Sequence, residues 1–397
     1  MTIDLMSIRS ASTEEIMRAA AQRTLTSDEI LAIKSRSFYL PITLLNIVSG
    51  EKEFDKRPVV RTAYNLLREL DTIEDAPRLE SEVKQKLIDK LTYLVGEVVI
   101  RNSHRDINDL LEGDTLRSMT ERLDQGIADP EEKVYVTQFG KGVVLQDLHG
   151  LEHGLQEDVD YAVKRMADGM KQFLERGEIQ TEEKLRTYSI YVARSIGRFL
   201  SKIVARKDVV DGKPVILYEE LAQSYGEFLQ LTNIIKNVRQ DHQDGRIFIP
   251  AVWRPHDVSH KYLVESIEAE NARSEVFEKA MQLVSSLRPA SLEYIMSIPE
   301  GLSGYRAFCF LPFVSADKTL ENLAIAGPER VFKEDVKISR EVAMNIADFG
   351  ANLVSVRGED KFKGFLDEYG PNPAKYSFDT DSYKNWSAGW LSEKGLF

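Results

Sequence analysis

Cysteine is almost absent from this chain of 397 residues, in which Cys309 is the only one. A single thiol excludes an internal disulfide, redox chemistry through paired thiols and a metal site made of several cysteines. No apolar run approaches the roughly 18 to 20 residues that a membrane-spanning helix needs, so we expect no transmembrane anchor. Residues 1–25 lack the apolar core of a signal peptide, and we therefore expect a mature start and a cytoplasmic protein.

Positive charge and strand-like patterns are also scarce. The chain has 52 Lys and Arg against 64 Asp and Glu, which gives a formal net charge of −12. Nucleic acid is excluded as the main partner, because phosphate binding needs a basic face. Alternating apolar and polar runs are rare, whereas long windows of 3.6-residue periodicity dominate, and this pattern predicts a mostly helical protein.

Residues 225–250, YGEFLQLTNIIKNVRQDHQDGRIFIP, carry an unusual polar stripe. A solvated helical stripe normally carries Lys and Glu, whereas this one carries amides and a carboxylate beside an apolar stripe. Such oxygen donors next to an apolar wall favour a site for a hard cation inside an apolar cavity. The residues of the stripe are Gly226, Gln230, Asn233, Asn237 and Asp241.

A second polar face lies within residues 59–78, where Tyr64, Arg68, Asp71 and Asp75 share one side of a predicted helix. Two carboxylates four residues apart repel each other by a few tenths of a kcal/mol on a surface helix. Arg68 would offset this repulsion through an ordinary salt bridge, and a bound metal ion would do the same. The spacing leaves both interpretations open, and the oxygen-rich stripe later in the chain favours the metal.

Two further patterns are weaker. His149, Glu152 and His153 match an H-x-x-E-H zinc pattern, but flanking glycines weaken the helix that it requires and no third ligand suggests itself. We therefore interpret these histidines as solvated. Arg36 and Ser37 belong either to a capped helix end or to an anion site, and the residues alone do not decide between the two.

Seven segments in collinear order resemble the squalene and phytoene synthase family, with the likeness nearer to squalene synthase. They are SRSF at 35–38, YNLLRELDTIED at 64–75, MADGM at 166–170, YSIYVARSIG at 188–197, FLQLTNIIKNVRQDHQDGRIFIPAVW at 228–253, AFCFLP at 307–312 and VFKEDVKI at 331–338. The resemblance implies a single-domain, all-α isoprenoid-synthase fold around a central cavity. We expect this catalytic domain over residues 31–350, after an N-terminal helical extension (1–30) and before a C-terminal tail packed on the domain (351–397).

In that family, Mg²⁺ held by two Asp-rich motifs binds the diphosphate of an allylic prenyl substrate and promotes its departure. The metal ligands that the resemblance implies are Asp71, Asp75, Asn233, Asn237 and Asp241. The implied diphosphate contacts are Arg36, Ser37, Arg68, Lys236 and Arg246. Tyr188 matches the tyrosine placed near the carbocation and, with Asp71 and Asp75, is an expected catalytic residue. The remaining implied substrate contacts are Phe38 and Phe308 as cavity wall, with Tyr64, Arg194 and Gln230.

Two positions depart from the family pattern, which usually has Asp in place of Asn237 and Gly in place of Arg194. A charge pair near 4 Å is worth about 4 kcal/mol at an effective dielectric constant of about 20, so the change to Asn beside a metal should not be neutral. We therefore expect a Mg²⁺-dependent prenyltransferase that couples a prenyl cation to a carbon nucleophile, with a small-molecule acceptor such as an electron-rich aromatic compound.

Two alternatives remain open. The first is head-to-head coupling of two farnesyl diphosphates to squalene or dehydrosqualene, and NADPH is expected as a cofactor only in this case. The second is a non-catalytic relative that acts as a binding partner, which the intact DTIED segment at 71–75 disfavours.

Overall fold

The chain forms two compact helical units, which are described one after the other. Unit 1 comprises Met1–Gly177 and Phe199–Val209, and unit 2 comprises Glu178–Arg198 and Val210–Phe397. The predicted all-α class is confirmed, with one short pair of strands, β1 (Val209–Val210) and β2 (Lys213–Pro214). The computed structural model describes residues 13–34, 41–42, 45, 55–101, 106–207, 209–210, 213–214, 219–299, 302–339, 341–343 and 346.

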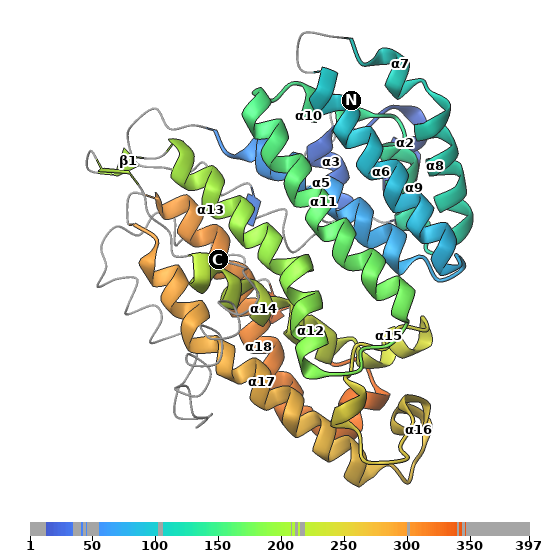
Figure 1. Ribbon diagram of the computed structural model, residues 1–397, viewed down its shortest axis with the longest axis vertical. Coiled ribbons are helices and arrows are strands. Elements are labelled where there is room, and N and C mark those ends of the chain that lie inside the picture. The colour runs from blue at the N-terminus through green and yellow to red at the C-terminus, as the bar shows by residue number, and fades with distance from the viewer. Residues whose placement is uncertain are drawn as a thin grey trace. The chain divides into compact units, whose positions relative to one another are not determined.

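In unit 1, the long helices α5, α6 and α11 pack against one another, and α6 and α11 run side by side (Figure 1). The shorter helices α8 and α9 cover them. The helices of unit 1 are α2 (Thr13–Gln22), α3 (Ser27–Lys34), α5 (Arg57–Asp75), α6 (Ser81–Arg101), α7 (Asn108–Leu111), α8 (Asp114–Gly126), α9 (Pro130–Phe139), α10 (Val143–His149) and α11 (His153–Arg176).

Helix α5 is enclosed by protein on every side but one. Pro58 in its first turn has the fixed φ that favours a helix start, and apolar residues such as Leu66 and Leu70 are fully buried. The residues that keep some exposure recur every three or four positions and define what we call the open stripe. Apart from Pro58, they are Arg57, Arg61, Tyr64, Arg68, Asp71 and Asp75.

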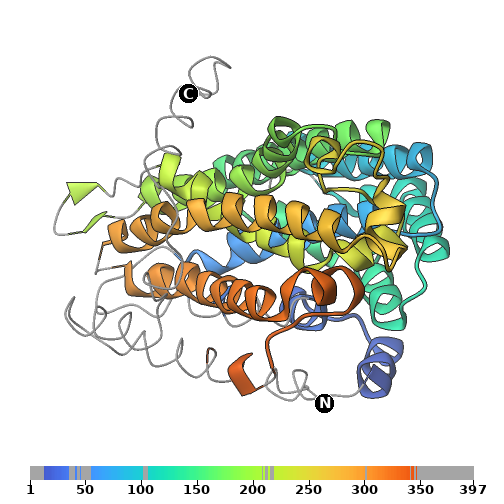
Figure 2. The same cartoon turned by 90° about the horizontal axis from the view of Figure 1, so that it is seen from below.

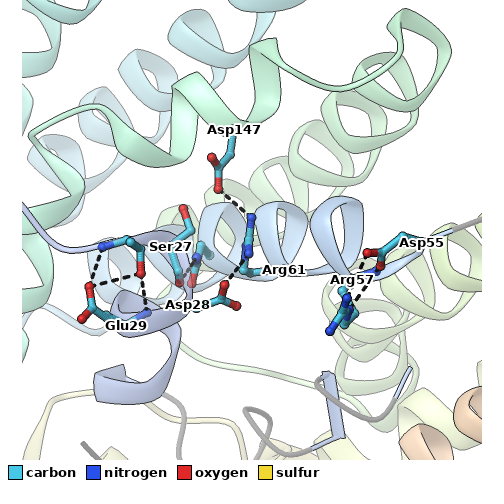
Figure 3. Close-up of polar contacts among 9 residues, drawn as sticks. Ser27, Asp28, Glu29, Asp55, Arg57, Arg61 and Asp147 are labelled. Atoms are coloured by element: carbon cyan, nitrogen blue, oxygen red, sulfur yellow. Dashed lines mark hydrogen bonds and ion pairs between the residues drawn. The ribbon is translucent and has the colours of Figure 1, made fainter. Parts of the chain in front are cut away.

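The N-terminal half of α5 is fixed to two neighbouring helices by Arg61 (Figure 3). Its Nη1 donates to Asp28 Oδ2 of α3 at 2.6 Å, and its Nη2 donates to Asp147 Oδ2 of α10 at 3.0 Å. Asn65 adds a bond from Nδ2 to the carbonyl oxygen of Ser27 at 3.1 Å. Charge-assisted bonds of this kind set the position of α3, the helix that immediately precedes the predicted anion segment at 35–38.

In unit 2, α14 packs on α17 and α18, and these two long helices run alongside each other (Figure 2). Tyr225 donates its hydroxyl to the carbonyl oxygen of Cys309 at 2.8 Å, and the rings of Phe228 and Phe313 lie 5.3 Å apart. The described helices of unit 2 are α12 (Glu182–Ser189), η1 (Ile190–Arg194), α14 (Glu219–Lys236), α15 (Val238–Gln243), η2 (Ala251–Trp253), α16 (His260–Glu265), α17 (Glu270–Ser297) and α18 (Ser303–Lys333). Helix α13 (Ser195–Lys207) begins in unit 2, and its residues from Phe199 on belong to unit 1.

Two predicted helices of unit 2 differ from their periodic patterns. Residues 186–205 form one helical run interrupted by a π-helical turn, η1, and such turns are frequent at functional sites. The polar-stripe helix ends at Lys236 and resumes at Val238. Asn237, with φ −98° and ψ 7°, lies between the two parts. Helix α15 ends at Gln243, shortly before Gly245, whose φ of 77° is one that an L side chain rarely adopts.

None of the helices within the described ranges is both long enough and apolar enough to cross a membrane. The predicted boundaries at residues 30 and 350 stay predictions, and the tail 351–397 lies outside the described residues.

Candidate active site

The first acidic segment lies at the C-terminal end of the open stripe of α5. Asp71 and Asp75 are both partly exposed there, whereas Glu74 between them turns inward and is buried. Arg68 donates from Nη1 to Asp71 Oδ2 at 3.0 Å. The predicted face is therefore confirmed as a face, with two carboxylates and a guanidinium directed along one side of the helix.

The charges on this face influence one another. Burial by itself would lower the pKa of Arg68, but Asp71, Tyr64 and Asp75 raise it above its usual value, so Arg68 stays cationic. A permanent cation beside two carboxylates offers contacts of both signs within about two helical turns. Such a surface suits a phosphate group that is itself bound to a divalent cation.

The donor set of α5 fits Mg²⁺. Among the described residues, no cluster of three or more His, Cys, Asp or Glu side chains has the arrangement of a complete metal cage. Mg²⁺ seldom needs one, because it is usually bound by one or two carboxylates together with substrate phosphates and waters. Asp71 and Asp75 supply carboxylates of this kind, and both keep contact with solvent.

The second oxygen-rich segment lies in unit 2, along α14 and α15. Gln230, Asn233 and Asn237 are partly or fully exposed on it, whereas Asp241 is buried. Asp241 Oδ1 accepts from Nη2 of Arg246 at 2.7 Å. The segment thus offers amide oxygens that ligands can reach, followed by a carboxylate paired with an arginine.

Lys236 lies on the same segment and donates from Nζ to Asn233 Oδ1 at 3.2 Å. Burial, followed by the nearby Lys337, lowers the pKa of Lys236, while Asp241 raises it in part. Lys337 is exposed and pairs with Asp335, whereas an anion bound beside Lys236 would offset the cost of its partial burial. This arrangement is consistent with the predicted diphosphate contact at Lys236.

Tyr188 is buried at the C-terminal end of α12, and its ring lies 5.1 Å from that of Phe248. Directly after Tyr188 the chain enters the π-helical turn η1, which packs on α14. A Cβ added at Gly226 of α14 would stand 2.9 Å from the carbonyl oxygen of Ala193 in η1. Gly226 is therefore required for the close approach of the helix of the amide stripe to the tyrosine segment.

A substitution tests this close approach. We expect Gly226→Ala to lower the free energy of unfolding by about 1 to 3 kcal/mol, because the added methyl group overpacks the crossing of α14 with η1. Gly96→Ala in α6 is the matched control, since the nearest atom there is 3.8 Å away and belongs to a lysine tip. Removing a glycine from that open helical position should stabilise by about 0.5 to 1 kcal/mol. Urea unfolding measures both, and equal effects of the two substitutions would contradict the crossing argument.

The remaining predicted residues are placed only in part. Phe308 is buried and its ring stacks 6.0 Å from that of Tyr305, and its role as cavity wall stays a prediction. Arg36, Ser37 and Phe38 lie outside the described residues, and so does the side chain of Arg194, whose backbone forms the end of η1.

The zinc pattern does not form a site. His149 ends α10, Glu152 is the cap of the next helix and His153 begins that helix, so the three residues do not share one helical face. His153 instead lies 3.6 Å from Glu157. The interpretation of this motif as a chance match agrees with the structure.

A surface groove of about 370 Å³ between α6 and α11 contains none of the predicted site residues. Tyr93, Gly96 and Lys164 are among the residues that line it. It is open to solvent, and its charged side chains are exposed or partly exposed, so we assign no chemistry to it.

Two polar clusters near the site were not predicted. Arg186 of α12 pairs with Glu227 of α14 at 2.9 Å, and both side chains are buried. His242 of α15 contacts both His260 and Glu265 of α16. Burial, then His242 and Arg254, lower the pKa of His260 to about 4. No short-range pattern links these residues, because 41 and 18 positions separate Arg186 from Glu227 and His242 from His260.

Comparisons with known proteins agree with this picture. A squalene synthase of Phoma sp. is 28% identical over 321 residues, which cover 78% of this chain and 69% of that protein. The squalene synthase of Homo sapiens is 27% identical over 365 residues, which cover 89% of this chain and 77% of that protein. A solved complex of TcSQS with a ligand has a TM-score of 0.63 at 21% identity and covers 90% of this chain and 98% of that one.

The last comparison shows the fold, which is that of the all-α isoprenoid synthases. The family model described as squalene/phytoene synthase matches residues 31–342, which is most of the chain. This protein therefore belongs to the squalene/phytoene synthase family.

Proposed function

We propose that this chain is a Mg²⁺-dependent prenyltransferase that ionises an allylic prenyl diphosphate and couples the prenyl group to a carbon nucleophile. The observation that carries the proposal is the open stripe of α5, the one exposed side of an otherwise enclosed helix. Arg68, Asp71 and Asp75 lie together on this stripe. A buried helix that exposes two carboxylates and a paired arginine is suited to hold a metal–diphosphate complex in a fixed place.

The residues of the chain have separate tasks in this reaction. Asp71 and Asp75 would hold Mg²⁺, which when bound supplies Lewis-acid neutralisation of the diphosphate charge. Arg68 can release Asp71 and donate its hydrogen bonds to phosphate oxygens instead. Buried rings such as Tyr188 and Phe248 exclude water from the allylic cation and stabilise it through their π faces. Considered by itself, unit 2 offers oxygen ligands of the same kind in Asn233, Asn237 and Asp241, beside Lys236 and Arg246, whose charge suits a phosphate.

For the acceptor, we propose a second prenyl diphosphate, because both curated relatives described above are squalene synthases. The aromatic acceptor expected from Asn237 and Arg194 finds no support in these comparisons. The cytoplasmic location expected from the composition stays a prediction.

The test is incubation of the purified protein with Mg²⁺ and farnesyl diphosphate, with and without NADPH, followed by analysis of the extracted products. A C30 hydrocarbon formed from farnesyl diphosphate alone supports head-to-head coupling. Diphosphate release without such a product, together with prenylation of an added electron-rich aromatic compound, would instead support an aromatic acceptor. No diphosphate release with any prenyl donor would favour a non-catalytic binding partner.

Asn237 is the position at which the chain departs from its family within the second segment. We expect Asn237→Asp to lower the Mg²⁺ concentration for half-maximal activity at least about tenfold, because a carboxylate attracts the ion more strongly than an amide. Donor ionisation should persist, while use of the second substrate should change. Gln282→Glu adds the same charge on the exposed face of α17 and serves as the control. Unchanged Mg²⁺ dependence and product pattern in Asn237→Asp would refute this account.

A further inference from the structure

Helix α15, which carries Asp241, is too short to hold its own direction. It spans Val238–Gln243, and the residue before it, Asn237, separates it from α14. Isolated helices below about 12 to 15 residues are marginal in water. The direction of the Asp241 carboxylate therefore depends on contacts that α15 makes with other elements.

His242, the next residue after Asp241, makes the most specific of these contacts. Its Nδ1 lies 3.2 Å from Nδ1 of His260, and its Nε2 lies 3.0 Å from Oε1 of Glu265. A carboxylate only accepts, so Nε2 of His242 carries the hydrogen of that bond. Between the two Nδ1 atoms, one ring donates and the other accepts. Both ring nitrogens of His242 are thus engaged by α16, and we call these three side chains the α15–α16 relay.

Helix α16 is itself a fixed support. Ser259 caps its start and accepts from the backbone N–H of Tyr262 at 3.1 Å. At its other end, the fully buried Arg273 of α17 donates to the carbonyl oxygens of Leu263 and Ser266 at 2.9 and 2.7 Å. The same guanidinium pairs with Glu329 of α18.

His242 directly follows Asp241 on α15, so contacts that hold the imidazole of His242 also hold the backbone from which Asp241 projects, while Arg246 bonds the Asp241 carboxylate itself. We propose that His242, His260 and Glu265 are positioning residues that hold α15 so that Asp241 faces the metal ion that it would bind. The relay deepens the proposed function and rests on it, because it presumes that Asp241 meets a divalent cation. The relay holds α15 in place and Arg246 bonds the carboxylate, so together they orient a ligating group from outside the metal's own set of ligands.

The test measures metal binding instead of turnover. Mn²⁺ replaces Mg²⁺, and its binding in the presence of inorganic diphosphate is followed by electron paramagnetic resonance. Loss of outer-shell partners weakens metal binding about 10- to 100-fold, and we expect about tenfold weaker Mn²⁺ binding in His260→Leu and Glu265→Leu. Glu265→Gln keeps an oxygen that accepts from His242, so it should bind Mn²⁺ within about twofold of the unmodified protein.

Glu265 is largely exposed, with 54% of its side chain accessible, so its variants test the relay without disturbing the core. His153→Gln is the matched control, since it removes another histidine next to a glutamate, in unit 1. Two results would refute the relay but leave the proposed function standing. One is Mn²⁺ binding in Glu265→Leu as tight as in the unmodified protein, and the other is Mn²⁺ binding in Glu265→Gln as weak as in Glu265→Leu. If the unmodified protein binds no Mn²⁺ with diphosphate, the proposed function fails and the relay with it.

Discussion

Replacing Asp71 with Asn should slow diphosphate release by about a thousandfold while the protein stays folded. A metal ion contributes several kcal/mol to the stabilisation of charge in the transition state, and each 1.4 kcal/mol corresponds to a tenfold change in rate. Asn removes one of the two carboxylates that α5 offers, with little change in shape. Because the pair of Asp71 with Arg68 is partly exposed, its loss should cost at most about 1 kcal/mol of stability.

The measurement is the rate of diphosphate release with farnesyl diphosphate, together with a thermal melt. Asp89→Asn is the control, because Asp89 also carries one charge and pairs with a cation, Lys171, on the exposed surface of unit 1. It should leave the rate unchanged. A rate for Asp71→Asn within tenfold of the unmodified protein would show that α5 does not hold the metal.

Arg186→Met should have the largest effect on stability. Arg186 and Glu227 are both less than 10% exposed and lie 2.9 Å apart. Removing the guanidinium leaves the buried carboxylate without this charge partner, and such a change costs about 3 to 5 kcal/mol. The double substitution Arg186→Met/Glu227→Leu removes both charges, and the protein should regain or exceed its original stability, since apolar replacements of a buried ion pair are often neutral or stabilising.

Urea unfolding of the two single variants and the double variant completes the thermodynamic cycle. Lys86→Met provides the comparison, because the pair of Lys86 with Glu82 on α6 is equally close but exposed. Its effect should stay below about 1 kcal/mol. If Arg186→Met is no more harmful than Lys86→Met, the buried pair does not join α12 to α14 as we infer.

Periodicity was sufficient to predict α5 and its polar face. The apolar residues of this helix follow the 3.6-residue repeat closely, so the exposed side could be assigned from spacing, and Asp71 and Asp75 lie on it. The spacing did not decide the chemistry of this face, because it suits both a salt bridge and a metal site; Arg68 does pair with Asp71, and the metal stays a prediction. Where local patterning determines the structure, the sequence was sufficient.

The break at Asn237 was not predicted, because the spacing of apolar and polar residues over 226–241 fits one continuous helix as well as it fits two. Its neighbours decide it: α15 takes a direction set by contacts with α16 and α18, which are distant in sequence. The π-helical turn η1 escaped prediction for a similar reason. Ile190–Arg194 carry no proline or glycine, and the turn lies where η1 packs closely on α14 at Gly226.

The enclosure of α5 also limits how often this helix opens. A helix shielded on every side but one can open only when much of unit 1 opens with it, so its backbone amides should be among the slowest in the chain to exchange with solvent. Asp71 and Asp75 then keep a constant separation through every cycle of binding and release. In the proposed reaction, any adjustment to prenyl chains of different length has to come from elements other than the helix that carries these carboxylates.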